Sequence, residues 1–166
     1  MKDTLKVTTP TDREVVITRV FDAPRALIFD CHTKPELVRR WLLGPPGWTM
    51  PVCEIDLRVG GRYRYVWRHA DGREMGMGGV MREIVVPERL VQTELFDEDW
   101  TGGETVATLV LTEKVGRTTL TNTVVYSTRE ARDGALRTGM TDGMEAGYAR
   151  LDELAAGMAN DTFQKE

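Results

Sequence analysis

Hydrophobic and polar positions alternate with a period of two in the first part of the chain and through most of its middle. Residues 14–22 are rich in β-branched side chains and predict a strand. Further strands are predicted over 52–58, 61–69, 76–86, 89–96, 105–114 and 117–127. The breaks between these strands are short and contain Gly or Pro, as tight hairpins require. Consecutive strands should therefore pair antiparallel in a meander.

Helical periodicity replaces the alternation directly after the first strand. Apolar stripes predict short helices over 25–31 and 33–41. Thr33 and Glu36 have the spacing of a capping box, so we expect Thr33 to cap the second helix. The Gly44-Pro45-Pro46-Gly47 run then ends helical structure.

A long helix is predicted over 138–158, where apolar residues recur at three- and four-residue steps. The pattern as a whole predicts an α+β fold in which a curved antiparallel sheet wraps around this C-terminal helix. No linker or repeat divides the 166 residues, so we expect a single domain. Its core should span about 14–158, with flexible tails at 1–13 and 159–166.

Composition excludes several classes of function. The net charge of −4 disfavours binding to nucleic acid, which requires a basic face. No run approaches the roughly 18 apolar residues of a membrane span, so no membrane partner is expected. The polar N-terminus lacks the apolar segment of a signal peptide, which makes a cytoplasmic protein the expectation. The two cysteines, Cys31 and Cys53, and the two histidines, His32 and His69, match no common zinc spacing. We predict no metal and no cofactor.

Strand parity indicates which side chains face the helix, because alternate residues of a strand point to opposite faces. Tyr63, Tyr65 and Trp67 share one face of their strand, and Met77 and Met81 share a face of the next, Gly-rich strand. Flexible methionines beside glycines favour a cavity over a solid core. The remaining apolar residues predicted to line this cavity are Trp41, Trp48, Met140, Met144, Tyr148 and Leu151.

Glu94 is the charged residue of greatest interest. If Pro87-Glu88 turns a hairpin, Glu94 falls nearly opposite Gly79 and shares the parity of Leu90, Gln92 and Phe96. A carboxyl group facing an apolar cavity has a raised pKa and is a functional candidate. The alternative is the opposite strand orientation, in which Glu94 is solvated or pairs with a surface arginine.

Several segments also resemble, in order and spacing, those of a known family. They are Pro35-Glu36-Leu37, Trp41-Leu42-Leu43-Gly44-Pro45, Asp56-Leu57-Arg58-Val59-Gly60-Gly61, Asp71-Gly72, Gly79-Val80 with Glu83-Ile84, Pro87-Glu88-Arg89-Leu90-Val91-Gln92-Thr93-Glu94, and Gly139-Met140 with Gly143-Met144 through Arg150-Leu151-Asp152-Glu153-Leu154. Together they resemble the activator-of-Hsp90-ATPase homologue-like family of the SRPBCC, or START-like, superfamily. This resemblance implies a helix-grip (Bet v 1-like) fold with a cavity between the sheet and the C-terminal helix.

Three functions remain open from the sequence. The leading hypothesis is a non-enzymatic protein that binds a small apolar or aromatic molecule. The second is a cyclase- or hydrolase-like enzyme that uses Glu94 or another inward carboxylate, with Tyr65 as proton donor; we identify no established catalytic motif for it. The third is a stress-response or co-chaperone-like interaction module with a filled interior. The sequence also leaves a homodimer open.

Overall fold

The computed structural model of the chain describes residues 5–98 and 102–164. Its strands are β1 (Lys6–Thr8), β2 (Glu14–Phe21), β3 (Trp48–Ile55), β4 (Arg62–His69), β5 (Glu74–Val85), β6 (Arg89–Phe96), β7 (Thr105–Lys114) and β8 (Arg117–Val125). Its helices are α1 (Arg25–Thr33), α2 (Pro35–Trp41), α3 (Arg129–Arg137) and α4 (Met140–Gln164). No helix within the described ranges has both the length and the apolar character needed to cross a membrane.

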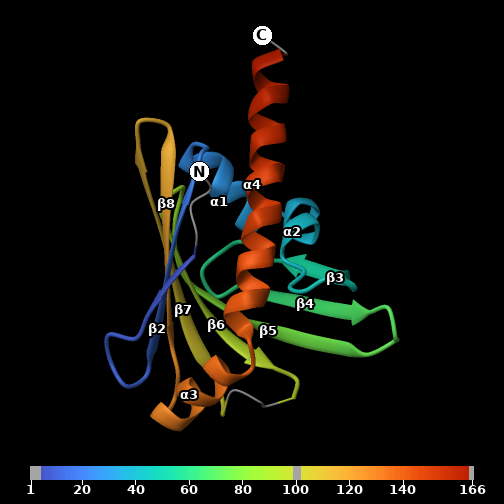
Figure 1. Cartoon of the computed structure of the whole chain (residues 1–166), viewed down its shortest axis with the longest axis vertical. Helices are drawn as coiled ribbons and strands as arrows, with labels where there is room; N and C mark the ends of the chain where they lie inside the picture. Colours follow the sequence, from blue (N-terminus) through green and yellow to red (C-terminus); the bar gives the residue numbers. More distant parts are fainter. Residues whose placement is uncertain (1–4, 99–101, 165–166) are drawn as a thin grey trace.

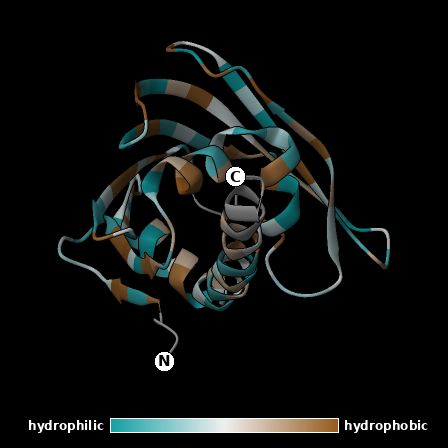
Figure 2. Ribbon diagram, turned by 90° about the horizontal axis from the view of Figure 1, so that it is seen from above, coloured by the Kyte–Doolittle hydropathy of each residue, from teal (hydrophilic) through white to brown (hydrophobic). Residues whose placement is uncertain are grey.

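The strands form one antiparallel sheet in the order β1-β2-β8-β7-β6-β5-β4-β3. Strands β3 to β8 are a meander, and β2 joins it by pairing with β8. Helices α1 and α2 connect β2 to β3, which lies at the far edge of the sheet. The sheet bends around α4 (Figures 1 and 2). The predicted α+β helix-grip fold is therefore confirmed.

The concave face of the sheet carries the apolar positions of the alternating pattern. In β2, Val15, Ile17 and Phe21 are fully buried. Register shifts interrupt the β3–β4 and β5–β6 pairs, and such bulges increase the bend and twist of a strand. These two bulges therefore contribute to the curvature of the sheet around α4.

Helix α4 changes its packing along its length. Leu151, Leu154 and Ala155 are buried against the sheet and the short helices. Met140 and Met144, about two to four turns earlier, are only partly buried. The C-terminal half of the apolar stripe thus closes the core, whereas the N-terminal half leaves space below it.

The predicted capping box is wrong. Thr33 is the last residue of α1, and its hydroxyl donates a hydrogen bond back to the Phe29 carbonyl at 3.0 Å. Lys34 is the N-cap of α2, without a side-chain cap, and Pro35 begins the helix. Pro is favoured there because its fixed φ suits the first turn and its missing N–H would have no partner. The spacing of Thr33 and Glu36 was therefore coincidental.

Secondary structure extends into the described parts of both predicted tails. Residues 6–8, assigned by the sequence to a tail, form β1 and pair with β2. Helix α4 continues to Gln164 through the other predicted tail.

Helix α3 was not predicted, because its sequence is mostly polar. Thr128 caps α3 by accepting a hydrogen bond from the Ala131 amide at 3.0 Å. Buried Arg132 ties the helix to the N-terminal segment by donating to the Thr11 carbonyl at 2.8 Å. These polar contacts explain why the helix forms without an apolar stripe.

Candidate ligand-binding cavity

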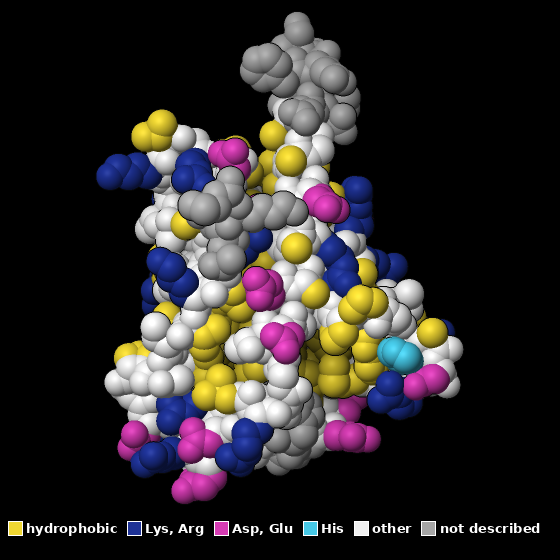
Figure 3. Space-filling view, viewed as in Figure 1, with side chains coloured by type: hydrophobic (Ala, Val, Ile, Leu, Met, Phe, Trp, Pro, Cys, Tyr) yellow, Lys and Arg dark blue, Asp and Glu magenta, His cyan; other side chains and the backbone are white. Residues whose placement is uncertain are grey.

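A cavity of about 630 Å³ lies between the concave face of the sheet and the N-terminal half of α4. Strands β4 to β8 form its floor, α4 covers it, and α2 with the loop after it closes one end. Hydrophobic side chains gather in the hollow beside this half of α4 (Figure 3). The space beside the partly buried Met140 and Met144 is therefore part of this cavity.

Most of the side chains predicted for a cavity line this one. They are Trp41, Trp48, Tyr65, Trp67, Met77, Glu94, Met140, Met144 and Tyr148. Tyr63, Met81 and Leu151 are buried in the surrounding core instead. Whether any of these residues contacts a ligand stays a prediction.

Tyr63 shares the inward parity of Tyr65 but has a structural role. Its hydroxyl donates a hydrogen bond to the Thr93 carbonyl at 2.6 Å. The same carbonyl approaches Gly79 so closely that a Cβ atom there would overlap it. The absence of a side chain at Gly79 thus lets β6 approach, and the phenol of Tyr63 is occupied by that strand.

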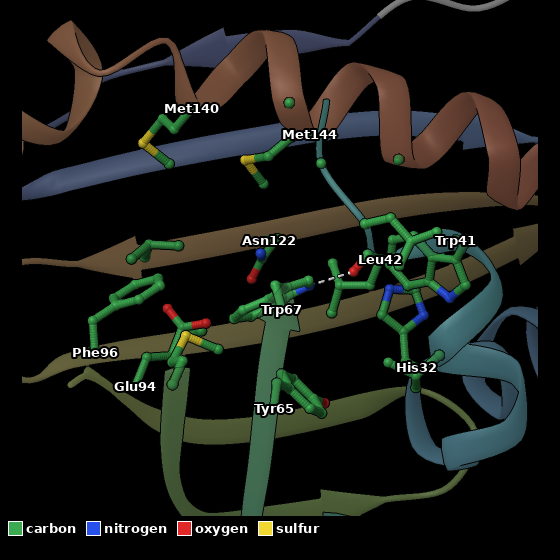
Figure 4. Close-up of a pocket in the computed structure, with 18 of the residues that line it drawn as sticks. His32, Trp41, Leu42, Tyr65, Trp67, Glu94, Phe96, Asn122, Met140 and Met144 are labelled. Atoms are coloured by element: carbon green, nitrogen blue, oxygen red, sulfur yellow. Dashed lines mark hydrogen bonds between the residues drawn. The ribbon is translucent and has the colours of Figure 1, made fainter. Parts of the chain in front are cut away.

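Two tryptophans of the cavity wall, Trp67 and Trp41, have indole N–H groups that already have partners. The Trp67 Nε1–H donates to the Leu42 carbonyl at 2.7 Å, and this bond ties the loop after α2 to the sheet (Figure 4). The Trp41 Nε1–H donates to the Cys31 carbonyl at 2.7 Å. Trp41 also stacks on Tyr148 of α4, with ring centroids 5.7 Å apart. The indoles therefore present apolar surface to the cavity.

Glu94 faces the cavity, as the hairpin argument predicted. The pairs Gly78 with Leu95 and Met81 with Gln92 fix a register that puts Glu94 opposite Gly79. Its carboxyl group points into the space between Phe96 and Trp67 (Figure 4). Burial raises the pKa of this carboxyl group, and the Thr105 hydroxyl, which donates to Oε1 at 3.1 Å, opposes that rise.

Four tyrosines lie within electrostatic reach of Glu94, and three of them, Tyr65, Tyr126 and Tyr148, line the cavity. Burial, and secondarily the Glu94 charge, raises the pKa of Tyr126 to about 12. The same two causes, in the same order of size, raise the pKa of Tyr148. For Tyr65, burial and then Cys53 precede Glu94 among the causes that raise its pKa. These phenols are therefore neutral hydrogen-bond donors at physiological pH.

His32 and Asn122 also line the cavity, although neither was predicted to do so from the sequence. His32 Nδ1 lies 2.8 Å from the Ile28 carbonyl, which can only accept, so Nδ1 carries the hydrogen. Burial lowers the pKa of His32 to about 4, and the ring is neutral at pH 7. Asn122 points into the cavity (Figure 4), and its Oδ1 is buried without a hydrogen-bond partner.

No group of three or more potential metal ligands occurs among the described His, Cys, Asp and Glu residues. Cys31 and Cys53 are both buried and free. Burial raises the pKa of the Cys31 thiol to about 11, so it is protonated and unreactive at neutral pH. The cysteines therefore contribute to packing.

Comparison with known proteins identifies relatives over nearly the whole chain. The sequence model described as "Activator of Hsp90 ATPase homolog 1-like protein" matches residues 22–156. A crystal structure of a protein from Rhodobacter sphaeroides is 35% identical, with a TM-score of 0.88, and the match covers 93% of this chain and 99% of that one. A comparison with curated proteins gave no match.

More distant solved structures share the fold. A protein from Nitrosomonas europaea is 23% identical with a TM-score of 0.81, over 92% of this chain and 99% of that one. The solution structure of an AHSA1-like protein from Aeromonas hydrophila is 16% identical with a TM-score of 0.67, over 84% and 93% of the two chains. At these identities the likeness concerns the fold alone.

Proposed function

Since the chain belongs to the activator of Hsp90 ATPase homolog 1-like family, whose fold is typical of ligand-binding or co-chaperone-like domains, we propose that it binds a small apolar or aromatic molecule without transforming it. The proposed site is the cavity between the sheet and the N-terminal half of α4. The observation that carries the proposal is the cavity itself, whose volume of about 630 Å³ falls within the usual range of ligand pockets.

The lining of the cavity supports binding of an apolar molecule. Tryptophan, methionine and leucine side chains dominate it, and a few polar groups are placed among them. This composition is common in small-molecule sites, where apolar surface provides affinity and isolated polar groups fix orientation. The methionines add adaptability, because their side chains are flexible and polarizable. An interaction module with a filled interior would leave no such space.

The hydrogen bonding of Glu94 favours binding over catalysis. Among the described residues, the side chain that hydrogen-bonds the Glu94 carboxyl group is Thr105. A general acid or base is usually positioned by a second titratable group. A Tyr, Arg or His within hydrogen-bond reach of Glu94 would favour a cyclase or hydrolase, and Tyr65 makes no such bond in the described part of the chain.

The test is a pair of phenylalanine substitutions on β7. Ala107 faces the cavity, whereas Thr108 is on the opposite face of the same strand. We expect wild type to bind the neutral fluorescent probe N-phenyl-1-naphthylamine saturably, because its rings match the apolar lining. Ala107→Phe should weaken binding by at least about tenfold by occupying the site. Thr108→Phe should leave it unchanged.

Melting temperatures of both variants establish that each is folded. Equal binding by wild type and both variants would contradict the proposal, because the probe would then occupy another surface. A saturable signal lost only in Ala107→Phe would support it.

A further inference from the structure

Among the described residues, the cavity lining includes an acidic side chain but no Lys or Arg. Of the described residues that line it, Glu94 alone carries a carboxyl group, and none is Lys or Arg. The other polar side chains, which include Asn122, Gln92 and Thr105, are uncharged. Any charged ligand would therefore meet an acid and no resident cation.

The basic groups close to the cavity are already engaged. Arg19 Nη2 lies 2.7 Å from the Asp152 carboxylate, and this ion pair joins β2 to α4. Arg150 Nη1 donates at 2.7 Å to the carbonyl of Gly44, in the loop that closes one end of the cavity. His32 lines the cavity as a neutral ring at pH 7, because burial lowers its pKa to about 4. Among the described residues, none that lines the cavity therefore supplies a positive charge to an anion inside.

From this distribution we infer that the cavity selects ligands whose polar group is a neutral or cationic hydrogen-bond donor, an alcohol, phenol or amine, over carboxylates, sulfonates and phosphates. The inference rests on the proposed binding function and specifies its ligand class. It also assigns Glu94 as the residue that determines this selectivity.

The energetic reason is the low dielectric of the site. An anion beside Glu94 would place two negative charges in apolar surroundings, so one of the two acids would have to take up a proton on binding. An amine instead forms an ion pair with Glu94, and an alcohol donates a charge-assisted hydrogen bond to it. Both donor classes avoid the cost that an anion incurs.

The geometry places the polar end of such a ligand at one position. Glu94 and Asn122 point into the same space below Met140 and Met144 (Figure 4). The Asn122 Oδ1 is buried without a partner, which makes it a second acceptor for a donor group. From there the apolar body can extend along Trp67 toward the other end of the cavity.

The experiment compares three probes with the same naphthalene body by titration calorimetry at pH 7.5. They are 2-naphthylmethylamine, 2-naphthylmethanol and 2-naphthoate, which are cationic, neutral and anionic. For wild type we expect the amine to bind at least about tenfold more tightly than the carboxylate, with the alcohol between them. Glu94→Gln should reduce the amine-to-carboxylate ratio to less than about threefold.

The matched control is Glu83→Gln, which removes the same charge from an exposed position of β5. This variant should keep the wild-type ratio. A carboxylate that binds as tightly as the amine to wild type would overturn the inference while leaving the proposed function in place. So would a preference that Glu94→Gln does not change. If none of the three probes binds wild type, the proposed function fails and the inference fails with it.

Discussion

Acidification should destabilise this protein through His32. In the folded state the ring is packed edge-on against Trp41, with centroids 4.8 Å apart, and its pKa is about 4 rather than the ordinary 6.5. Below pH 6.5 the unfolded chain binds a proton at His32 that the folded chain does not. The stability contributed by the neutral ring is therefore complete above pH 6.5 and is lost as the pH falls towards 4.

The size of the effect follows from the two pKa values. Between pH 8 and pH 5, protonation of the unfolded state should remove about 2 kcal/mol of unfolding free energy. Urea unfolding at pH 8 and pH 5, monitored by circular dichroism, measures this loss. In His32→Asn, whose amide can still donate to the Ile28 carbonyl, the loss should be smaller by that amount.

The other histidine of the chain is the control. His69 is at the end of β4, beside Asp71 in the following turn and outside the buried contact of α1 and α2. His69→Asn should retain the wild-type loss between pH 8 and pH 5. If His32→Asn and wild type lost the same stability over that interval, burial of a neutral ring at His32 would be refuted.

Two further substitutions test contacts around the cavity. Asp152→Ala leaves Arg19, which is 4% exposed, without its counter-ion and should cost about 3 kcal/mol of unfolding free energy, whereas Glu153→Ala on the exposed side of α4 should cost little. Equal urea midpoints for these two variants would contradict the importance of the ion pair. Tyr63→Phe removes the donor to the buried Thr93 carbonyl and should cost about 1–3 kcal/mol by the same assay. Tyr65→Phe is its matched control on the same face of β4, and an equal loss in both would refute the role of that hydrogen bond.

The sheet and the orientation of its aromatic strand could be predicted because both depend on local patterns. The alternation in β4 determines that Tyr65 and Trp67 face inward, and the parity of β6 places Glu94 on the face of the buried Leu90. These inferences need only the two-residue period and the position of a turn. The residue that pairs with Glu94 depends in addition on the register shift between Met81 and Glu83, which the alternation of the sequence does not reveal.

The polar part of the cavity could not be predicted in the same way. Asn122 shares a face of β8 with the buried Leu120 and Val124, but alternation within one strand does not indicate whether that face meets a neighbour or a space. The inward position of Asn122 follows from its pairing with Ile17 and Leu109, which are distant in sequence. His32 likewise lines the cavity only because α1 packs beside α2. Such residues become recognisable when the tertiary contacts are known.

Tyr63 illustrates a different limit. Its parity is that of a cavity residue, but the close approach of β6 at Gly79 engages its hydroxyl. Leu151 has the periodicity of Met144, but it lies where α4 already contacts the core. Periodicity determines the direction of a side chain. The distance to the neighbouring element determines whether that side chain contacts another residue or lines a cavity.

The two unequal halves of α4 also have a kinetic consequence. Amide hydrogens exchange through local openings whose free energy increases with the apolar contacts that must be broken. The first two turns of α4, from Met140 to Gly147, cover a cavity, whereas the turns around Leu151 and Ala155 are buried in the core. Exchange should therefore be faster in the first part of the helix, and the same opening would provide a route by which a molecule enters and leaves.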